Sequence, residues 1–246
     1  MHHGAAPNRK ASKVKLEPIA IIGMSGRFPD APDVDAFWRN VRDGRDSVTE
    51  APRDRGWDIA DYYEAKPQTR GKTYSRHGAF LPDIDRFDPL FFEIAPNTVE
   101  IMDPSARLFL EEAWRAIEDA GYASASLNGA RCGLYFCAKG DYANLVQRYE
   151  ETYLASTDTY VPARLAYHLN LVGPALSVDT ACSSTLTALV YACDALTLGN
   201  CDVAVVGGGG LNATPNALVT SSQMLLYSPT GRCRTFSEDA DGTVLG

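Results

Sequence analysis

The sequence predicts a layered α/β fold, α/β/α in order, around a mostly parallel sheet. Short continuous apolar runs suit strands buried on both faces, and they alternate with segments whose apolar residues repeat at helical spacing. The alternation is clearest over 162–206, in the order helix, strand, tight turn, helix, strand. This order is typical of parallel strands joined by helices. With 246 residues, of which 45% are hydrophobic, the chain can bury a sizeable core.

The N-terminal region predicts a leader, a strand and a helix. Residues 1–16 are polar and without periodicity, so we expect a flexible leader. The apolar run 18–23 predicts a buried strand. Asp33 can cap a helix that ends near Gly44, and one face of this helix is expected to pack. That face carries Val34, Phe37, Trp38 and Val41.

The next stretch predicts an irregular excursion and then a second helix. Residues 45–100 are rich in proline, aspartate and aromatic residues, which favours a layer on the core rather than regular sheet. Asp103 with Pro104 can begin a helix, and Gly121 can end it. Its apolar stripe consists of Leu110, Ala113, Trp114, Ile117 and Ala120.

The rest of the chain predicts three strands and two helices. The runs 132–137, 176–180 and 203–206 are expected to be strands. The segment PARLAYHLN has helical character, and a longer helix is expected from Ser183 to Gly199. The longer helix has apolar residues at helical spacing, namely Leu186, Leu189, Val190, Cys193 and Leu196.

Composition excludes several classes of function. The net charge of -8 argues against nucleic-acid binding and anionic membranes, which usually need a basic face. No apolar run approaches the length of about 20 residues that spans a bilayer, so a cytoplasmic protein is expected. In that compartment cysteines are thiols rather than disulfides, and their spacing predicts no metal site. They are Cys132, Cys137, Cys182, Cys193, Cys201 and Cys233.

Two further patterns have simple structural interpretations. The segment GMSGRFP and the run Gly207 to Gly210 match neither nucleotide-binding glycine motif, so we expect sharp turns or close backbone approach there. Arg232, Arg234 and the segment RDRGWD are interpreted as solvated surface, with a local basic patch for an acidic carrier protein left open.

Cys182 is the candidate nucleophile. It follows the predicted strand 176–180 and precedes the predicted helix, so its thiol would lie at a helix N-terminus. The partial positive charge there favours the thiolate, which is the reactive form. Small neighbours leave room for a substrate carbonyl, and the Cys182 N–H could face a developing oxyanion. The alternative is a buried structural thiol such as Cys193.

Four ordered blocks resemble the N-terminal half of the beta-ketoacyl synthase (ketosynthase) domain of type I polyketide synthases. The resemblance covers residues 17–246 and implies a thiolase-like fold that is incomplete at its C-terminus. One departure is Ser105, where the family commonly has glutamine. The blocks are EPIAIIGMSGRFP, MDPSARLFLEEAWRAIEDAGY, RLAYHLNLVGPALSVDTACSS and SPTGRCRTFSEDADGTVLG.

The resemblance implies that Cys182 accepts an acyl chain as a thioester, with its backbone N–H in the oxyanion hole. The phosphopantetheine arm of an acyl carrier protein would deliver the acyl chain, so no directly bound cofactor is expected. Decarboxylation of a malonyl-type extender would then give the carbanion for a Claisen condensation. A homodimer is also implied.

The catalytic histidines and lysine of that family lie well after the cysteine, beyond these 246 residues. The chain contains only His2, His3, His77 and His168, and none occupies a catalytic position of the family. The chain alone is therefore expected to be inactive and to need the C-terminal half, from the same or a separate chain. Two alternatives stay open, a coenzyme A-dependent thiolase-fold acyltransferase and a non-elongating subunit that shapes chain length.

Overall fold

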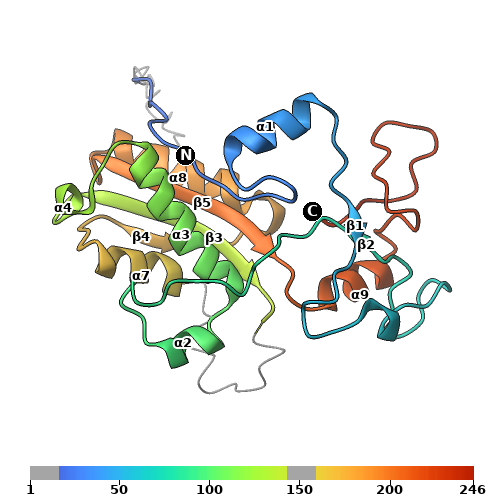
Figure 1. The fold of residues 1–246 in the computed structure, drawn as a ribbon. Coiled ribbons are helices and arrows are strands. Elements are labelled where there is room, and N and C mark those ends of the chain that lie inside the picture. The colour runs from blue at the N-terminus through green and yellow to red at the C-terminus, as the bar shows by residue number, and fades with distance from the viewer. Residues whose placement is uncertain (1–16, 143–158) are drawn as a thin grey trace, which may run out of the picture.

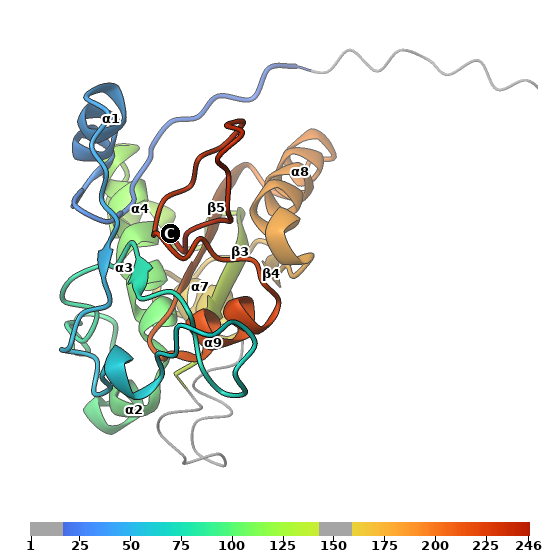
Figure 2. The ribbon, with the colours of Figure 1, turned by 90° about the vertical axis from the view of Figure 1, so that its right-hand side faces the viewer.

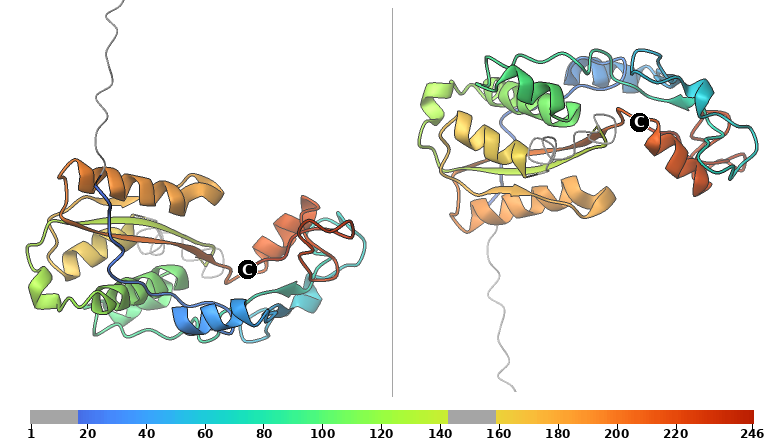
Figure 3. Two further views of the ribbon diagram at one scale, coloured as in Figure 1. Left: turned by 90° about the horizontal axis from the view of Figure 1, so that it is seen from above. Right: turned by 90° about the horizontal axis from the view of Figure 1, so that it is seen from below.

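The computed structural model describes residues 17–142 and 159–246, and their core is a three-layer α/β/α arrangement (Figure 1). Its sheet has the strand order β4-β3-β5, and both neighbouring pairs are parallel. One helix covers one face, and two helices cover the other (Figure 3). The strands are β3 (Cys132–Gly140), β4 (Ala175–Ser177) and β5 (Val203–Leu211), and the helices are α8 (Ser184–Thr197) opposite α3 (Pro104–Asp119) and α7 (Tyr160–His168).

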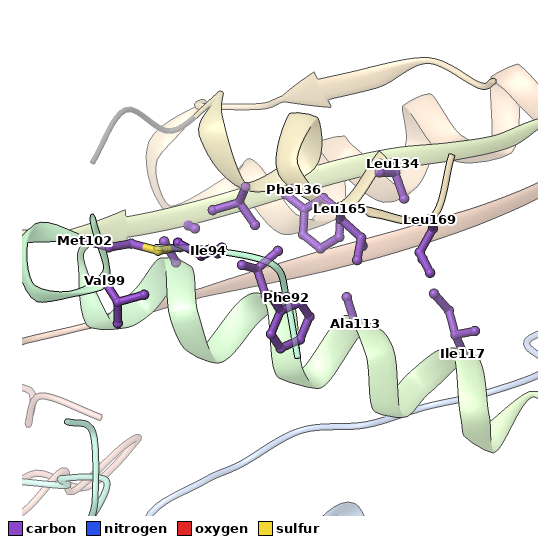
Figure 4. Close-up of a cluster of buried hydrophobic side chains, with 14 of the residues drawn as sticks. Phe92, Ile94, Val99, Met102, Ala113, Ile117, Leu134, Phe136, Leu165 and Leu169 are labelled. Carbon is purple, nitrogen blue, oxygen red and sulfur yellow. The ribbon is translucent and has the colours of Figure 1, made fainter. Parts of the chain in front are cut away.

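The main core lies between β3, α3 and α7 (Figure 4). Leu134 and Phe136 of β3 point into the layer where Leu165 of α7 and Ala113 of α3 meet them. Leu134 and Leu165 are completely buried. The strand therefore buries one set of side chains against these two helices, while its other face carries Tyr135 toward α8.

A second, smaller apolar cluster lies apart from the main core. Its elements lie beyond the C-terminal ends of the strands in Figure 1, and Figure 2 shows them from that side. It joins the irregular excursion to the last part of the chain through Trp57, Tyr74, Leu218 and Tyr227. The remaining elements are α1 (Val34–Arg42), the antiparallel pair β1 (Thr49–Glu50) and β2 (His77–Gly78), the 3-10 turns η1 (Ile59–Asp61) and η2 (Ala181–Ser183), α2 (Pro96–Ile101), α4 (Ser124–Leu127) and α9 (Asn216–Gln223).

The predicted helix boundaries are confirmed. The Asp33 carboxylate accepts a hydrogen bond from Ala36 N at 2.6 Å, and Asp103 accepts one from Ser105 N at 2.8 Å. The glycines that follow α1, α3 and α8 all have positive φ. The strand predicted at 176–180 is shorter and earlier, because β4 ends at Ser177 before the turn that carries Cys182. The leader, 1–16, lies outside the described residues.

The strand predicted over 18–23 is wrong in this structure, where the segment is irregular. Gly23 approaches the backbone of α3 too closely for a side chain, and Met24 N donates to Asp119 at 2.8 Å. A cavity of about 1390 Å³ separates the segment from β5. A strand needs backbone hydrogen bonds to a neighbouring strand, and no described strand lies beside this segment.

The expectation that one face of α1 packs through its large apolar residues is wrong for Trp38 and Val41, which are more than half exposed. The large apolar residues of α8 are also mostly exposed, although Leu196 packs against a core cluster. In α1 the only buried residue is Ala36, and Trp38 is 63% exposed. In α8 the buried residues are small, with Ala188 and Ala192 at the centre, while Leu186 is 70% exposed. Small side chains let α8 lie close to the sheet, so its larger residues point away from it.

The segment RDRGWD is not wholly solvated, contrary to the interpretation from sequence. The Arg55 side chain is 4% exposed and donates to the carbonyls of Leu81 and Asn212. The Trp57 indole is buried and donates to Ala213 O at 2.8 Å. These bonds tie the excursion to the chain that leaves β5.

Candidate functional site

Cys182 lies where the sequence places it, at the junction between β4 and α8. It is the middle residue of the short turn η2, and α8 begins two residues later. Its side chain is exposed to solvent. The turn therefore presents the thiol at the N-terminal end of a 14-residue helix.

The backbone just before Cys182 is strained. Ala181 has a φ of 57°, in the left-handed region that residues other than glycine rarely adopt. This conformation costs about 1–2 kcal/mol for an L-residue. The carboxylate of Asp179 accepts a hydrogen bond from Ala181 N at 3.0 Å, which offsets part of that cost. The strained turn directs the next residue, Cys182, out of the line of the strand.

Two serines tie this turn to the first turn of α8. Buried Ser184 accepts from Thr180 N at 2.8 Å and donates to Ala181 O at 2.6 Å. Ser183 donates to the carbonyl oxygen of Thr180 at 2.8 Å. These hydrogen bonds join the turn around Cys182 to the start of α8.

The other cysteines differ from Cys182 in their environment. Cys132 and Cys201 are buried, and burial raises the pKa of both thiols, that of Cys132 to about 11. Cys137 and Cys193 are half-buried, and only Cys233 shares the exposure of Cys182. Cys233 lies in the irregular C-terminal stretch, so Cys182 is the one exposed thiol at a helix start.

The structure brings neither described histidine to Cys182. His168 packs against Phe91, Phe92 and Trp114, on the face of the sheet opposite α8. His77 belongs to β2, beyond the strand ends, and sits against Gly231. His168 is thus packed among aromatic rings and lies apart from Cys182.

Within 17–142 and 159–246 the structure holds no candidate metal cluster and no candidate membrane-spanning helix. No group of three or more His, Cys, Asp or Glu residues in these ranges could hold a metal ion. None of the helices there has the length and apolar character that crossing a membrane requires.

Several residues that shape the site were missed by the sequence analysis. The strain at Ala181 and the carboxylate contact from Asp179 have no pattern in the sequence that signals them. The glycines of β5 were expected to permit close approach, and they do: a side-chain carbon on Gly207 would overlap Phe136. The sequence did not indicate that Gly208 lies close to Thr185 of α8.

Sequence comparison finds strong similarity across the chain. The family described as "Beta-ketoacyl synthase, N-terminal domain" matches residues 16–246. Polyketide synthase ThaG of Burkholderia thailandensis is 44% identical over 236 residues, which cover 93% of this chain and 4% of that protein. Polyketide synthase PksM of Bacillus subtilis is 42% identical over 243 residues, which cover 98% of this chain and 6% of that protein.

Solved structures give the same result for the fold. The oxazolomycin ketosynthase domain OzmH KS7 of Streptomyces albus matches with a TM-score of 0.84 and 39% identity, over 91% of this chain and 41% of that one. The ketosynthase from module 6 of the Bacillus subtilis bacillaene synthase matches with a TM-score of 0.83 and 37% identity, over 92% and 38%. The chain thus spans about two fifths of the length of these two ketosynthases. The structural match confirms the predicted thiolase-like fold class.

Proposed function

Because the chain belongs to the beta-ketoacyl synthase family and matches its N-terminal domain, we propose that Cys182 is the acyl-accepting nucleophile of a polyketide ketosynthase. The observation that carries this proposal is the geometry at Cys182, an exposed thiol on a strained strand-to-helix turn. Such a turn holds the sulfur clear of the backbone, at the end of a helix dipole that favours the thiolate.

The first step is transfer of an acyl group to Cys182. The Sγ thiolate attacks the carbonyl carbon of an acyl thioester on the phosphopantetheine arm of acyl carrier protein. A C–S bond forms, the carbonyl oxygen takes the negative charge, and the Cys182 N–H serves as one donor to it. Collapse of this intermediate breaks the bond to the phosphopantetheine sulfur, which leaves as a thiolate and takes up a proton.

The second step needs groups that these 246 residues do not contain. A malonyl-type extender on acyl carrier protein loses carbon dioxide, and its carbanion attacks the Cys182 thioester. The new carbon–carbon bond gives a β-ketoacyl product, and Cys182 leaves again as a thiolate. The chain therefore supplies the nucleophile, and we expect it to be inactive without the C-terminal half of the ketosynthase.

Two exposed features of the sheet and of α8 support contacts with the rest of the ketosynthase and with a second copy of the chain. The outward side of α8 carries exposed Leu186, Val190 and Tyr191, which favours contact with the rest of the ketosynthase. β4 is at the edge of the described part of its sheet, which supports a homodimer formed along that edge. All six cysteines are free, which fits the reducing cytoplasm.

A condensation assay tests the proposed function. A protein that carries this chain together with the rest of a ketosynthase domain is supplied with acyl and malonyl groups on acyl carrier protein. We expect β-ketoacyl product from the wild type and from the half-buried control Cys193→Ser, and none from Cys182→Ala. Undiminished product from Cys182→Ala would contradict the role of this thiol. Equal rates with coenzyme A thioesters would contradict the use of a carrier protein.

A further inference from the structure

The first turn of α8 rests directly on the backbone of β5 at Gly208. A side-chain carbon built there would lie 2.6 Å from Cβ and Cγ2 of Thr185, and closer still to its Oγ1. Separations below 3.0 Å essentially never occur for real Cβ atoms, so one of the two elements would have to shift. Gly208 does not have positive φ, so space rather than backbone conformation requires glycine.

The contact at Thr185 is linked to Cys182 through the turn that both share. Ser184, the residue before Thr185, is buried and is hydrogen-bonded to both Thr180 N and Ala181 O. A shift of the helix start therefore carries the turn and Cys182 with it. The Cβ of Thr185 is among the crowded atoms, so rotation of its side chain alone cannot relieve the overlap.

The neighbouring Gly209 has a different environment. A side-chain carbon there would meet Phe109 Cζ at 3.5 Å, an ordinary van der Waals contact. Both glycines lie in the same strand, one residue apart, and their side-chain positions point to opposite faces of the sheet. Gly209 is thus a matched control that changes the same strand without touching α8.

We propose that Gly208 is a positioning residue for the nucleophile. Because Gly208 has no side chain, Thr185 packs directly against the backbone of β5, and this contact sets the position of Cys182. The proposal rests on the proposed function, because it concerns the same thiol. Misplacing a reacting group by about 1 Å can lower a rate by about 100-fold. We therefore expect the change to act on kcat rather than on the KM for the carrier protein.

The test compares Gly208→Ala with Gly209→Ala in a protein that carries this chain with the rest of the ketosynthase. We measure kcat and KM for transfer of an acyl group from acyl carrier protein to Cys182, and the folded fraction by circular dichroism. We expect Gly208→Ala to lower kcat by about 100-fold with KM close to the wild-type value. Gly209→Ala should match the wild type in both.

A compensating variant separates positioning from loss of folding. Thr185→Gly removes the three atoms that lie nearest to the new methyl group, so Gly208→Ala combined with Thr185→Gly should recover most of the kcat of Thr185→Gly alone. The proposal is overturned if Gly208→Ala and Gly209→Ala have equal kcat, or if the combined variant stays as slow as Gly208→Ala. If Gly208→Ala does not fold, the combined variant alone decides. Absence of acyl transfer in the wild type would instead contradict the proposed function.

Discussion

At the scale of single residues, the cysteines differ in what surrounds them. Cys132 is 1% exposed, and burial raises its pKa to about 11, so the protonated thiol is the favoured form until the pH approaches that value. Cys182 is exposed on the turn before α8. Both residues carry the same chemical group, and of the two only Cys182 is open to solvent in this fold.

Alkylation of the folded protein should separate these thiols. At pH 8 about 0.1% of a thiol with a pKa near 11 is ionised, so iodoacetamide should leave Cys132 unmodified while it labels Cys182. Exposed Cys233 serves as the control for reagent access. Labelling is measured by peptide mass spectrometry. Modification of Cys132 at the rate of Cys233 would contradict the burial described here.

The strained residue before the nucleophile gives a second prediction. Ala181→Val should lower the free energy of unfolding by more than about 1 kcal/mol, because a β-branched side chain tolerates positive φ poorly. Ala181→Gly relieves strain but adds freedom to the unfolded chain, so its stability should stay within about 1 kcal/mol of the wild type. Urea unfolding measures both. Equal losses in the two variants would show that the backbone conformation is not the cause.

At the scale of elements, the helices were predictable, and so was the buried stripe of α3 through Leu110, Ala113 and Ile117. The buried faces of α1 and α8 were not predictable. Caps and terminal glycines are local signals, and Asp33, Asp103 and Gly199 act as the sequence indicates. Apolar spacing in α8 indicated a buried stripe through Leu186, yet the helix packs by its alanines. Periodicity identifies a helix, but it cannot distinguish the face that meets the sheet from one that meets a further layer.

Packing of α8 can be tested by substitutions on its two sides. Ala188 is completely buried against the sheet, so Ala188→Leu should overpack that layer and cost about 1–3 kcal/mol of unfolding free energy. Leu186→Gln, on the exposed side, should change it by no more than about 0.5 kcal/mol. Thermal or urea unfolding of this chain measures both. The assignment of faces is wrong if the order of the two effects is reversed.

At the scale of the whole molecule, the layered α/β fold and the order of its central elements could be predicted, and the segment 18–23 could not. Its apolar run favours a strand, but strand formation depends on a neighbour elsewhere in the molecule. The structure places a cavity between this segment and β5 instead. The candidate site was also predictable only in part. The strand-to-helix junction at Cys182 follows from the local sequence pattern, whereas the contact between Thr185 and Gly208 depends on how α8 and β5 pack together.

Exposed apolar residues give a prediction about the chain on its own. Leu186, Leu189 and Val190 lie at helical spacing on α8 and are each at least 45% exposed, and monomers rarely expose a large contiguous apolar patch. We expect the isolated chain to bind a hydrophobic dye and to self-associate in size-exclusion chromatography, and a complete ketosynthase domain to bind less dye per molecule. A monomeric chain without dye binding would contradict this expectation.

In the proposed function Cys182 accepts the acyl chain, and mapping the site of acyl loading tests this claim. A protein that carries this chain with the rest of a ketosynthase domain is incubated with acyl-loaded acyl carrier protein, without extender, and its peptides are analysed by mass spectrometry. We predict that the acyl mass appears on the peptide with Cys182 and not on the one with exposed Cys233. An acyl group on any other residue, with Cys182 unmodified, would contradict the claim.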